Sequence, residues 1–78
     1  MIVDAMPDKQ KAFEDLAKTE RDIAEREKRV AAQIAIIARM TENGQDTTEA
    51  QKLLQDLEKT LKQFRTRRQL IVDALTRG

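Results

Sequence analysis

The sequence predicts an all-α protein: a long antiparallel two-helix hairpin of the coiled-coil type that dimerises into a four-helix bundle. Charged residues make up 37% of the 78 residues and aromatic residues 3%, and Cys, His, Trp and Tyr are absent. A chain built mainly from Ala, Leu, Ile, Glu, Lys, Arg and Gln favours helix over sheet. A chain of this length forms at most one domain. A single internal break and a seven-residue repeat complete the prediction.

The internal break is the segment Asn43-Gly44-Gln45-Asp46. Gly44 suits the left-handed position that follows many helices, because glycine has no Cβ atom to clash. Asp46 is predicted to be the N-cap of the next helix, with Glu49 completing a capping box three residues later. Because so short a connection places consecutive helices side by side, it predicts an antiparallel pair.

The boundaries follow from these signals. We predict a flexible N-terminal tail over residues 1–6, a helical hairpin over 7–78, a first helix over about 7–43, a turn over 44–46 and a second helix over about 47–76. Pro7 is tolerated in the first turn of a helix. At 1.5 Å per residue the helices would be rods of roughly 55 and 45 Å. Ile2, Val3 and Met6 in the tail would be bare on a monomer. The alternatives are that they fold back, that they dock on a partner, or that they are a frayed terminus.

Both predicted helices carry a seven-residue apolar repeat, which is typical of a coiled-coil interface. In the first helix, alanines follow large aliphatic residues by one position, and small side chains let two helices approach closely. The alternative is that alanine is there only as the best helix former. The predicted helix–helix core is Leu16, Ala17, Ile23, Ala24, Val30, Ala31, Ile34, Ile37, Ala38, Leu54, Leu57, Leu61, Phe64, Ile71 and Leu75.

A register for the hairpin can be predicted by pairing residues whose numbers sum to about 91, which places Leu61 opposite Val30. Arg68, the charged residue in the second helix's repeat, then lies opposite Ile23, between Glu20 and Glu27. One hypothesis is a polar cluster of Arg68, Glu20 and Glu27 that fixes the register. The alternative is an exposed end of the interface, where Arg68 extends to water.

Self-association is expected because two helices alone bury little apolar surface. Ordering costs about 1.5 kcal/mol per residue, and a small chain without disulfide or metal seldom offsets it. Leu53, Leu70, Val72 and Ala74 widen the apolar surface of the second helix. A second hairpin would cover them, and most oligomers are symmetric, so a homodimer is the expected form.

The sequence argues against catalysis. The chain has no His, Cys, Tyr or Ser to act as acid, base or nucleophile, and no glycine-rich phosphate loop. The acidic residues from Glu20 to Glu27 lack the histidines of di-metal carboxylate bundles, and interleaved basic residues indicate a solvated helix face. We therefore expect a non-enzymatic interaction protein without cofactor, metal or small-molecule substrate.

Two alternative functions stay open. Lys59, Lys62 and Arg65 approach a stripe within a run that lacks acidic residues, so a hairpin dimer could bind RNA or DNA, although such runs are usually solvated. The hairpin could instead be a coiled-coil adaptor or subunit for another protein. The sequence contains no membrane-length apolar segment and its start does not resemble a signal peptide, so a cytoplasmic protein is expected.

One resemblance concerns the centre of the chain, roughly residues 20–64. The segments Gly44-Gln45-Asp46-Thr47 and Glu49-Ala50-x-x-Leu53-Leu54 resemble a group of short uncharacterised bacterial helical-hairpin proteins. In that group a helix ends at a Gly-x-Asp-Thr turn, which is followed by Ala-x-x-Leu-Leu. Members often carry His where this chain has Gln45. The resemblance implies a small bacterial helical hairpin and no particular activity.

Overall fold

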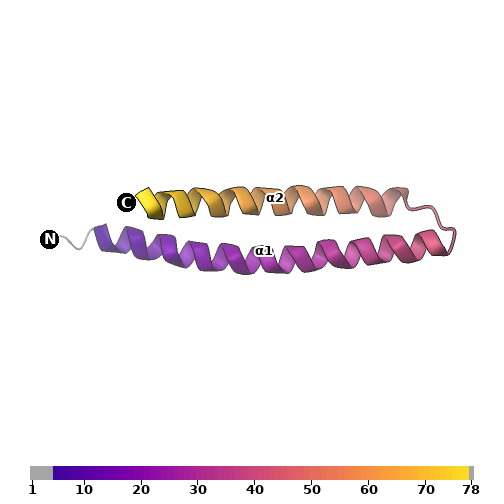
Figure 1. The fold of residues 1–78 in the computed structure, drawn as a ribbon, viewed down its shortest axis with the longest axis horizontal. Coiled ribbons are helices and arrows are strands. Elements are labelled where there is room, and N and C mark those ends of the chain that lie inside the picture. Colours follow the sequence, from indigo (N-terminus) through magenta and orange to yellow (C-terminus); the bar gives the residue numbers. More distant parts are fainter. Residues whose placement is uncertain (1–4, 78) are drawn as a thin grey trace.

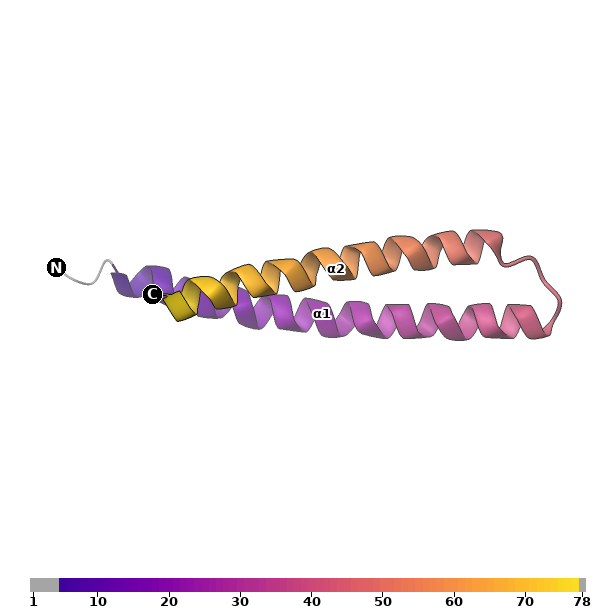
Figure 2. The ribbon, with the colours of Figure 1, turned by 45° about the horizontal axis from the view of Figure 1, so that its top comes forward.

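The chain folds as two long helices that lie antiparallel along their length. The computed structural model describes residues 5–77, in which α1 spans Ala5–Glu42 and α2 spans Thr48–Arg77. The two helices lie side by side in both ribbon views, and the start of α1 and the end of α2 lie at the same end of the rod (Figures 1 and 2). The rod measures 66 × 15 × 14 Å. The predicted all-α helical hairpin is confirmed.

The start of α1 lies two residues earlier than predicted. Ala5 and Met6 belong to the helix, so Pro7 is its third residue, where a missing N–H costs no intrahelical hydrogen bond. Ile2 and Val3, which were predicted to belong to an N-terminal tail, lie outside the described residues.

Gly44 ends α1 in the way the sequence predicts. Its φ of 71° is in the left-handed region, which favours glycine. The backbone N–H of Gly44 donates to the carbonyl of Thr41 (3.1 Å), and that of Gln45 donates to the carbonyl of Met40 (2.9 Å). These two bonds form a Schellman motif, which satisfies carbonyls that the helix end would otherwise leave unpaired.

The start of α2 differs from the prediction by one residue. The carbonyl of Thr47 accepts the first helical bond, from the N–H of Gln51 at 2.8 Å, so Thr47 is the N-cap. Asp46 precedes the cap, and its carboxylate accepts from the N–H and the hydroxyl of Thr48 (3.0 and 2.7 Å). Glu49 lies 3.7 Å from Lys52 instead of bonding back to Asp46. The predicted capping box is therefore wrong, because Asp46 and Thr48 form their own side-chain turn.

The interface of α2 with α1 follows the predicted repeat. Leu61 is buried, and Leu54, Leu57, Phe64, Ile71 and Leu75 are half-buried. On α1 the repeat of Leu16, Ile23, Val30 and Ile37 also faces α2. The second column of α1 in this interface is Ala12, Thr19, Arg26, Gln33 and Met40. We use the name seam for the interface formed by the repeat of α2 and the two columns of α1.

The predicted core is wrong for five residues of α1. The four alanines are exposed, and Ile34 is 49% exposed, so they do not lie between the helices. Of the four residues that are buried in the described part of the chain, Thr19 and Gln33 are polar, whereas Ile23 and Leu61 are hydrophobic. The residues concerned are Ala17, Ala24, Ala31, Ile34 and Ala38.

The register of the hairpin also differs from the prediction, by about one helical turn. The side chain of Gln33 donates to the carbonyl of Ala50 at 2.9 Å, and a helical carbonyl points towards the residue four positions on. This contact places Gln33 beside Leu54, so the numbers of facing residues sum to about 87. In the predicted register Gln33 would face Glu58, about 6 Å further along α2. The connection of residues 43–47 is longer than predicted, and the pairing shifts with it.

Candidate interaction surface

The second column of α1 in the seam, at seven-residue spacing, has three polar members, Thr19, Arg26 and Gln33. Thr19 is 3% exposed and Gln33 is 7% exposed. Gln33 is satisfied by the carbonyl of Ala50, a bond that links the two helices near the turn. Burial of polar groups contributes less to stability than burial of apolar groups of the same size, because their hydration is lost. This column therefore makes the seam a weaker core than four uninterrupted apolar heptads would be.

Arg26 occupies the third position of this column. Its guanidinium carbon lies 4.5 Å from the centroid of the Phe64 ring, a cation–π contact across the seam. Its Nε atom is buried and has no hydrogen-bond partner among the described residues. The side chain thus covers the only aromatic ring of α2 while leaving one donor unsatisfied, which reduces its net contribution to stability.

The predicted cluster of Arg68 with Glu20 and Glu27 is not formed. Glu27 is instead bonded to Arg65, whose Nη2 atom lies 2.9 Å from the carboxylate, and both side chains are half-exposed. Within the described residues, no carboxylate lies at ion-pair distance from Arg68, which is half-buried in the seam. The shift in register explains the difference, because it places Arg68 opposite Thr19 rather than Ile23.

The hairpin has two broad faces, one on each side of the seam. In an antiparallel pair, heptad positions e lie on one face and positions g on the other. Glu27 and Arg65 occupy e positions, and their ion pair confirms this geometry. We call this side the alanine face; it carries Phe13, Ala17, Ala24, Ala31, Ile34, Ala38 and Val72. The other side, here called the leucine face, carries Asp15, Asp22, Ile36, Leu53, Arg67, Leu70 and Ala74.

Large apolar side chains are exposed on both faces. On the alanine face these are Phe13 (56% exposed) and Ile34 (49%). On the leucine face they are Ile36 and Leu53 (both 49%) and Leu70 (65%). The single broad apolar surface expected from Leu53, Leu70, Val72, Ala74 and the alanines is therefore divided, with Val72 and the alanines on the opposite side from the leucines.

The leucine face is hollowed near the middle of the rod. A depression of about 240 Å³ is lined by both helices and reaches the edge of the Phe64 ring. Its lining is mainly polar and combines Asp15, Lys18 and Asp22 of α1 with Arg67 of α2 beside the Phe64 ring. The lining residues are Asp15, Lys18, Thr19, Asp22, Phe64 and Arg67.

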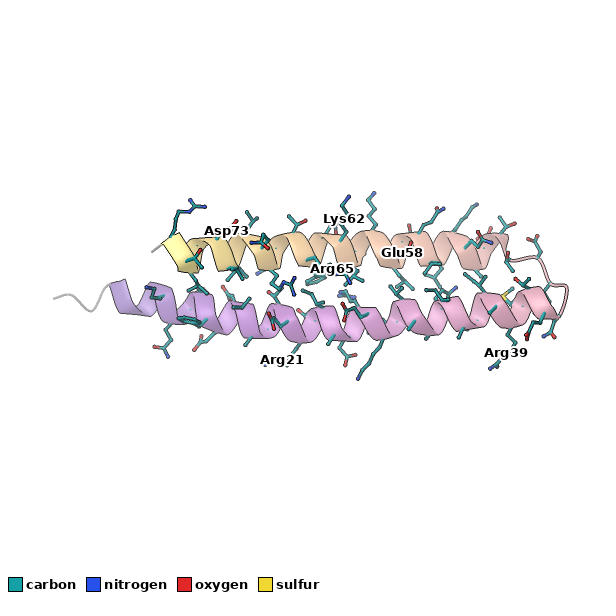
Figure 3. All side chains as sticks on the ribbon, in the orientation of Figure 1. Arg21, Arg39, Glu58, Lys62, Arg65 and Asp73 are labelled. Atoms are coloured by element: carbon teal, nitrogen blue, oxygen red, sulfur yellow. The ribbon has the colours of Figure 1, made fainter. Side chains whose placement is uncertain are left out.

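The predicted basic stripe is only partly free. Lys59 and Lys62 are exposed, and Figure 3 shows Lys62 pointing away from α1, whereas Arg65 lies between the two helices. Arg65 is engaged by Glu27 at 2.9 Å, so its charge is locally compensated. The structure does not bring the three residues together as a stripe of free cations.

Among the described residues, Asp46 is the one group whose pKa clearly departs from its ordinary value. Hydrogen bonds from the hydroxyl and then the backbone N–H of Thr48 stabilise the carboxylate and lower its pKa below 3.8, against a small opposing effect of desolvation. The hydrogen bonds that lower this pKa lie at the turn between the two helices. Among the described residues, no group of three or more acidic side chains is placed to hold a metal ion.

The comparisons add no relative: no family model, curated protein or solved structure matches the chain. Among the described residues, neither helix has an apolar stretch long enough to cross a membrane. Sequence reasoning missed the polar column of the seam, because Ala12, Thr19, Arg26, Gln33 and Met40 share no chemical character that would mark a buried column.

Proposed function

We propose that this chain is a small non-enzymatic interaction protein that self-associates, so that a second copy completes its apolar core. The observation that carries the proposal is the imbalance between buried and exposed apolar residues. Only two hydrophobic residues are buried among those described, whereas five large ones are between 49% and 65% exposed. So few buried and so many exposed large apolar side chains support an interaction surface on this chain.

The surface area supports the same proposal. The hairpin exposes 6225 Å², whereas a compact globular chain of its mass of 9.0 kDa exposes about 4,850 Å². The excess is roughly 1,400 Å², which exceeds the approximately 800 Å² that each partner buries in a standard interface. One interface of ordinary size would therefore cover more than half of this excess.

The segment Val30–Ala38 gives a third, local reason. Gln33 is its single polar residue, and that side chain is buried in the seam. A helix that is apolar all round is typical of a position covered on several sides. In the hairpin only one side of this segment is covered, by α2.

The concentration dependence of thermal unfolding tests the proposal. Circular dichroism avoids the absorbance problem of a chain without Trp or Tyr. For a dimer that unfolds with dissociation, the midpoint is expected to rise by roughly 8 °C over a hundredfold increase in concentration. A midpoint that is independent of concentration would contradict self-association. An adaptor role, with a helical partner of another sequence, would then become the better account.

A role in RNA or DNA binding is the second candidate, since Lys59 and Lys62 are exposed within a run that lacks acidic residues. Fluorescence anisotropy of labelled RNA and DNA oligonucleotides at low salt tests it. Binding that weakens steeply with salt and is lost on changing both lysines to Gln would favour this function. The bacterial origin implied by the resemblance and the cytoplasmic location stay predictions that accompany either candidate.

A further inference from the structure

Three large apolar side chains project from the leucine face at the two ends of the rod. Ile36 and Leu53 lie near the turn and are each 49% exposed. Leu70 lies towards the opposite end and is 65% exposed. The depression beside Phe64 and Arg67 lies between these positions along α2. The face thus offers apolar projections near both ends and a hollow between them.

The exposed apolar residues and the depression lie at similar distances along α2 on either side of Thr60. Leu53, Thr60 and Arg67 are seven residues apart, so they lie in one line along the helix. Thr60 is midway, half-buried and small enough for a second helix to approach closely. In the register of the hairpin, Ile36 lies level with residue 51 of α2, about nine residues before Thr60. Leu70 lies ten residues after it.

We propose that the leucine face binds a second copy of this chain in antiparallel orientation, about a twofold axis that passes beside Thr60. The proposal rests on the self-association argued above and specifies its surface and geometry. The axis places Leu53 of each copy in the depression formed by Phe64 and Arg67 of the other. It also places Ile36 and Leu70 of each copy on the surface that the other copy covers. One axis therefore covers all three exposed apolar side chains.

The charge distribution favours the antiparallel arrangement over the parallel one. The turn end of the rod, residues 30–57, has two basic and four acidic side chains, a net charge of −2. The remainder of the chain has a net charge of +3. A parallel dimer would place like ends together, whereas the antiparallel dimer places the acidic turn end beside the basic end of the other copy.

Two isoleucines supply a matched test of the surface. Ile36 and Ile34 are two residues apart and equally exposed, at 49%, but they lie on opposite faces. In the proposed dimer, Ile36→Glu buries a carboxylate at two symmetric places. It should raise the dissociation constant at least about 30-fold, whereas Ile34→Glu should change it by less than about threefold. Sedimentation with interference optics measures both, and circular dichroism checks that each variant stays helical.

Single cysteines test the axis, since the chain has none of its own. Under mild oxidation Thr60→Cys should form a disulfide-linked dimer, because the two copies of this residue meet at the axis. Gln45→Cys, at the exposed turn, should form none. In the antiparallel dimer its two copies lie at opposite ends of the rod, roughly 45 Å apart or more. A parallel dimer would place the two copies of Gln45→Cys at the same end of the rod and would cross-link there.

The outcomes separate this proposal from the self-association on which it rests. A wild-type chain that is monomeric at all concentrations overturns both. A wild-type dimer that Ile34→Glu dissociates while Ile36→Glu leaves it intact overturns the assignment to the leucine face alone. A dimer in which Gln45→Cys cross-links, or in which Thr60→Cys does not, overturns the antiparallel axis. Dissociation by Ile36→Glu together with cross-linking at Thr60→Cys alone supports the proposal.

Discussion

Gly44 determines where α1 stops, because its backbone has a φ of 71° that a side chain with a Cβ atom rarely adopts. A methyl group added at this position would have no atom within 4 Å, so the cost of a substitution is conformational rather than steric. We expect Gly44→Ala to lower the free energy of unfolding by about 1 kcal/mol. Urea unfolding at a fixed chain concentration measures it.

The matched variant at this position is Gly44→Asn. Asparagine tolerates the left-handed conformation better than alanine does. Gly44→Asn should therefore lower the free energy of unfolding clearly less than Gly44→Ala does. Equal losses for the two variants would contradict a conformational origin.

Asp46 gives the turn a dependence on acidity. Its folded-state pKa lies below the ordinary 3.8 because the Thr48 hydroxyl and N–H donate to the carboxylate. Its contribution to stability is therefore present above 3.8 and is lost as the pH falls through the lowered pKa. Many carboxylates titrate in this range, so the test is a difference: thermal midpoints of the wild type and Asp46→Asn should converge as the pH is lowered there. A constant difference would refute the assignment.

Gln33 is buried in the seam, and its hydrogen bond goes to a carbonyl that also serves the helical ladder of α2. Replacing it with leucine should therefore leave no unsatisfied partner and should add apolar contact with Leu54. We expect Gln33→Leu to raise the free energy of unfolding by about 1 kcal/mol, as measured by urea denaturation. Gln33→Ala, which removes both bond and volume, should lower it. A loss of stability in Gln33→Leu would show that the bond to Ala50 outweighs the gain in burial.

At the scale of the helices, the sequence predicts α2 better than α1. The repeat of large apolar residues in α2 leaves one possible seam, and the structure uses it. In α1 the aliphatic column is flanked by two candidate columns, one of four alanines and one of mixed residues. The column of alanines lies outside the interface between the helices, and the column of mixed residues lies inside it. Alanine is compatible with either place, since it is the best helix former and buries little, so its regularity carried less information about packing.

The register was out of reach for a related reason. Apolar columns with a seven-residue repeat match again after every shift by a full repeat, and nearly match after a shift by one turn. The length of the connection decides between such registers, and it depends on which residue caps α2. The structure places the N-cap of α2 at Thr47 rather than Asp46. Because the register differs from the predicted one, Glu27 pairs with Arg65 and the predicted ion cluster around Arg68 does not form.

The ion pair between the helices tests the corrected register. In a double-mutant cycle, Glu27→Ala and Arg65→Ala should show a coupling energy of about 0.2–1 kcal/mol that decreases with added salt, since both side chains are half-exposed. The same cycle between Glu27→Ala and Arg68→Ala should give no coupling beyond error. A larger coupling to Arg68 than to Arg65 would restore the predicted register and contradict the structure.

At the scale of the whole molecule, the hairpin is a rod with a thin core. Its length of 66 Å and width of about 15 Å leave most residues in contact with solvent, and no side chain is fully buried among those described. Small domains usually require a disulfide, a metal or a partner to offset the entropy of ordering. A second copy on the leucine face would supply that partner and would leave the alanine face, whose alanines are inexpensive to expose, in water.

The solution mass of the chain tests this account most directly. Size-exclusion chromatography with light scattering and refractive-index detection measures it without the need for aromatic absorbance. We expect twice the chain mass of 9.0 kDa, from a helical species that dissociates only on dilution. A helical species with the mass of one chain at every concentration would contradict the account, because a thin hairpin core would then be sufficient on its own.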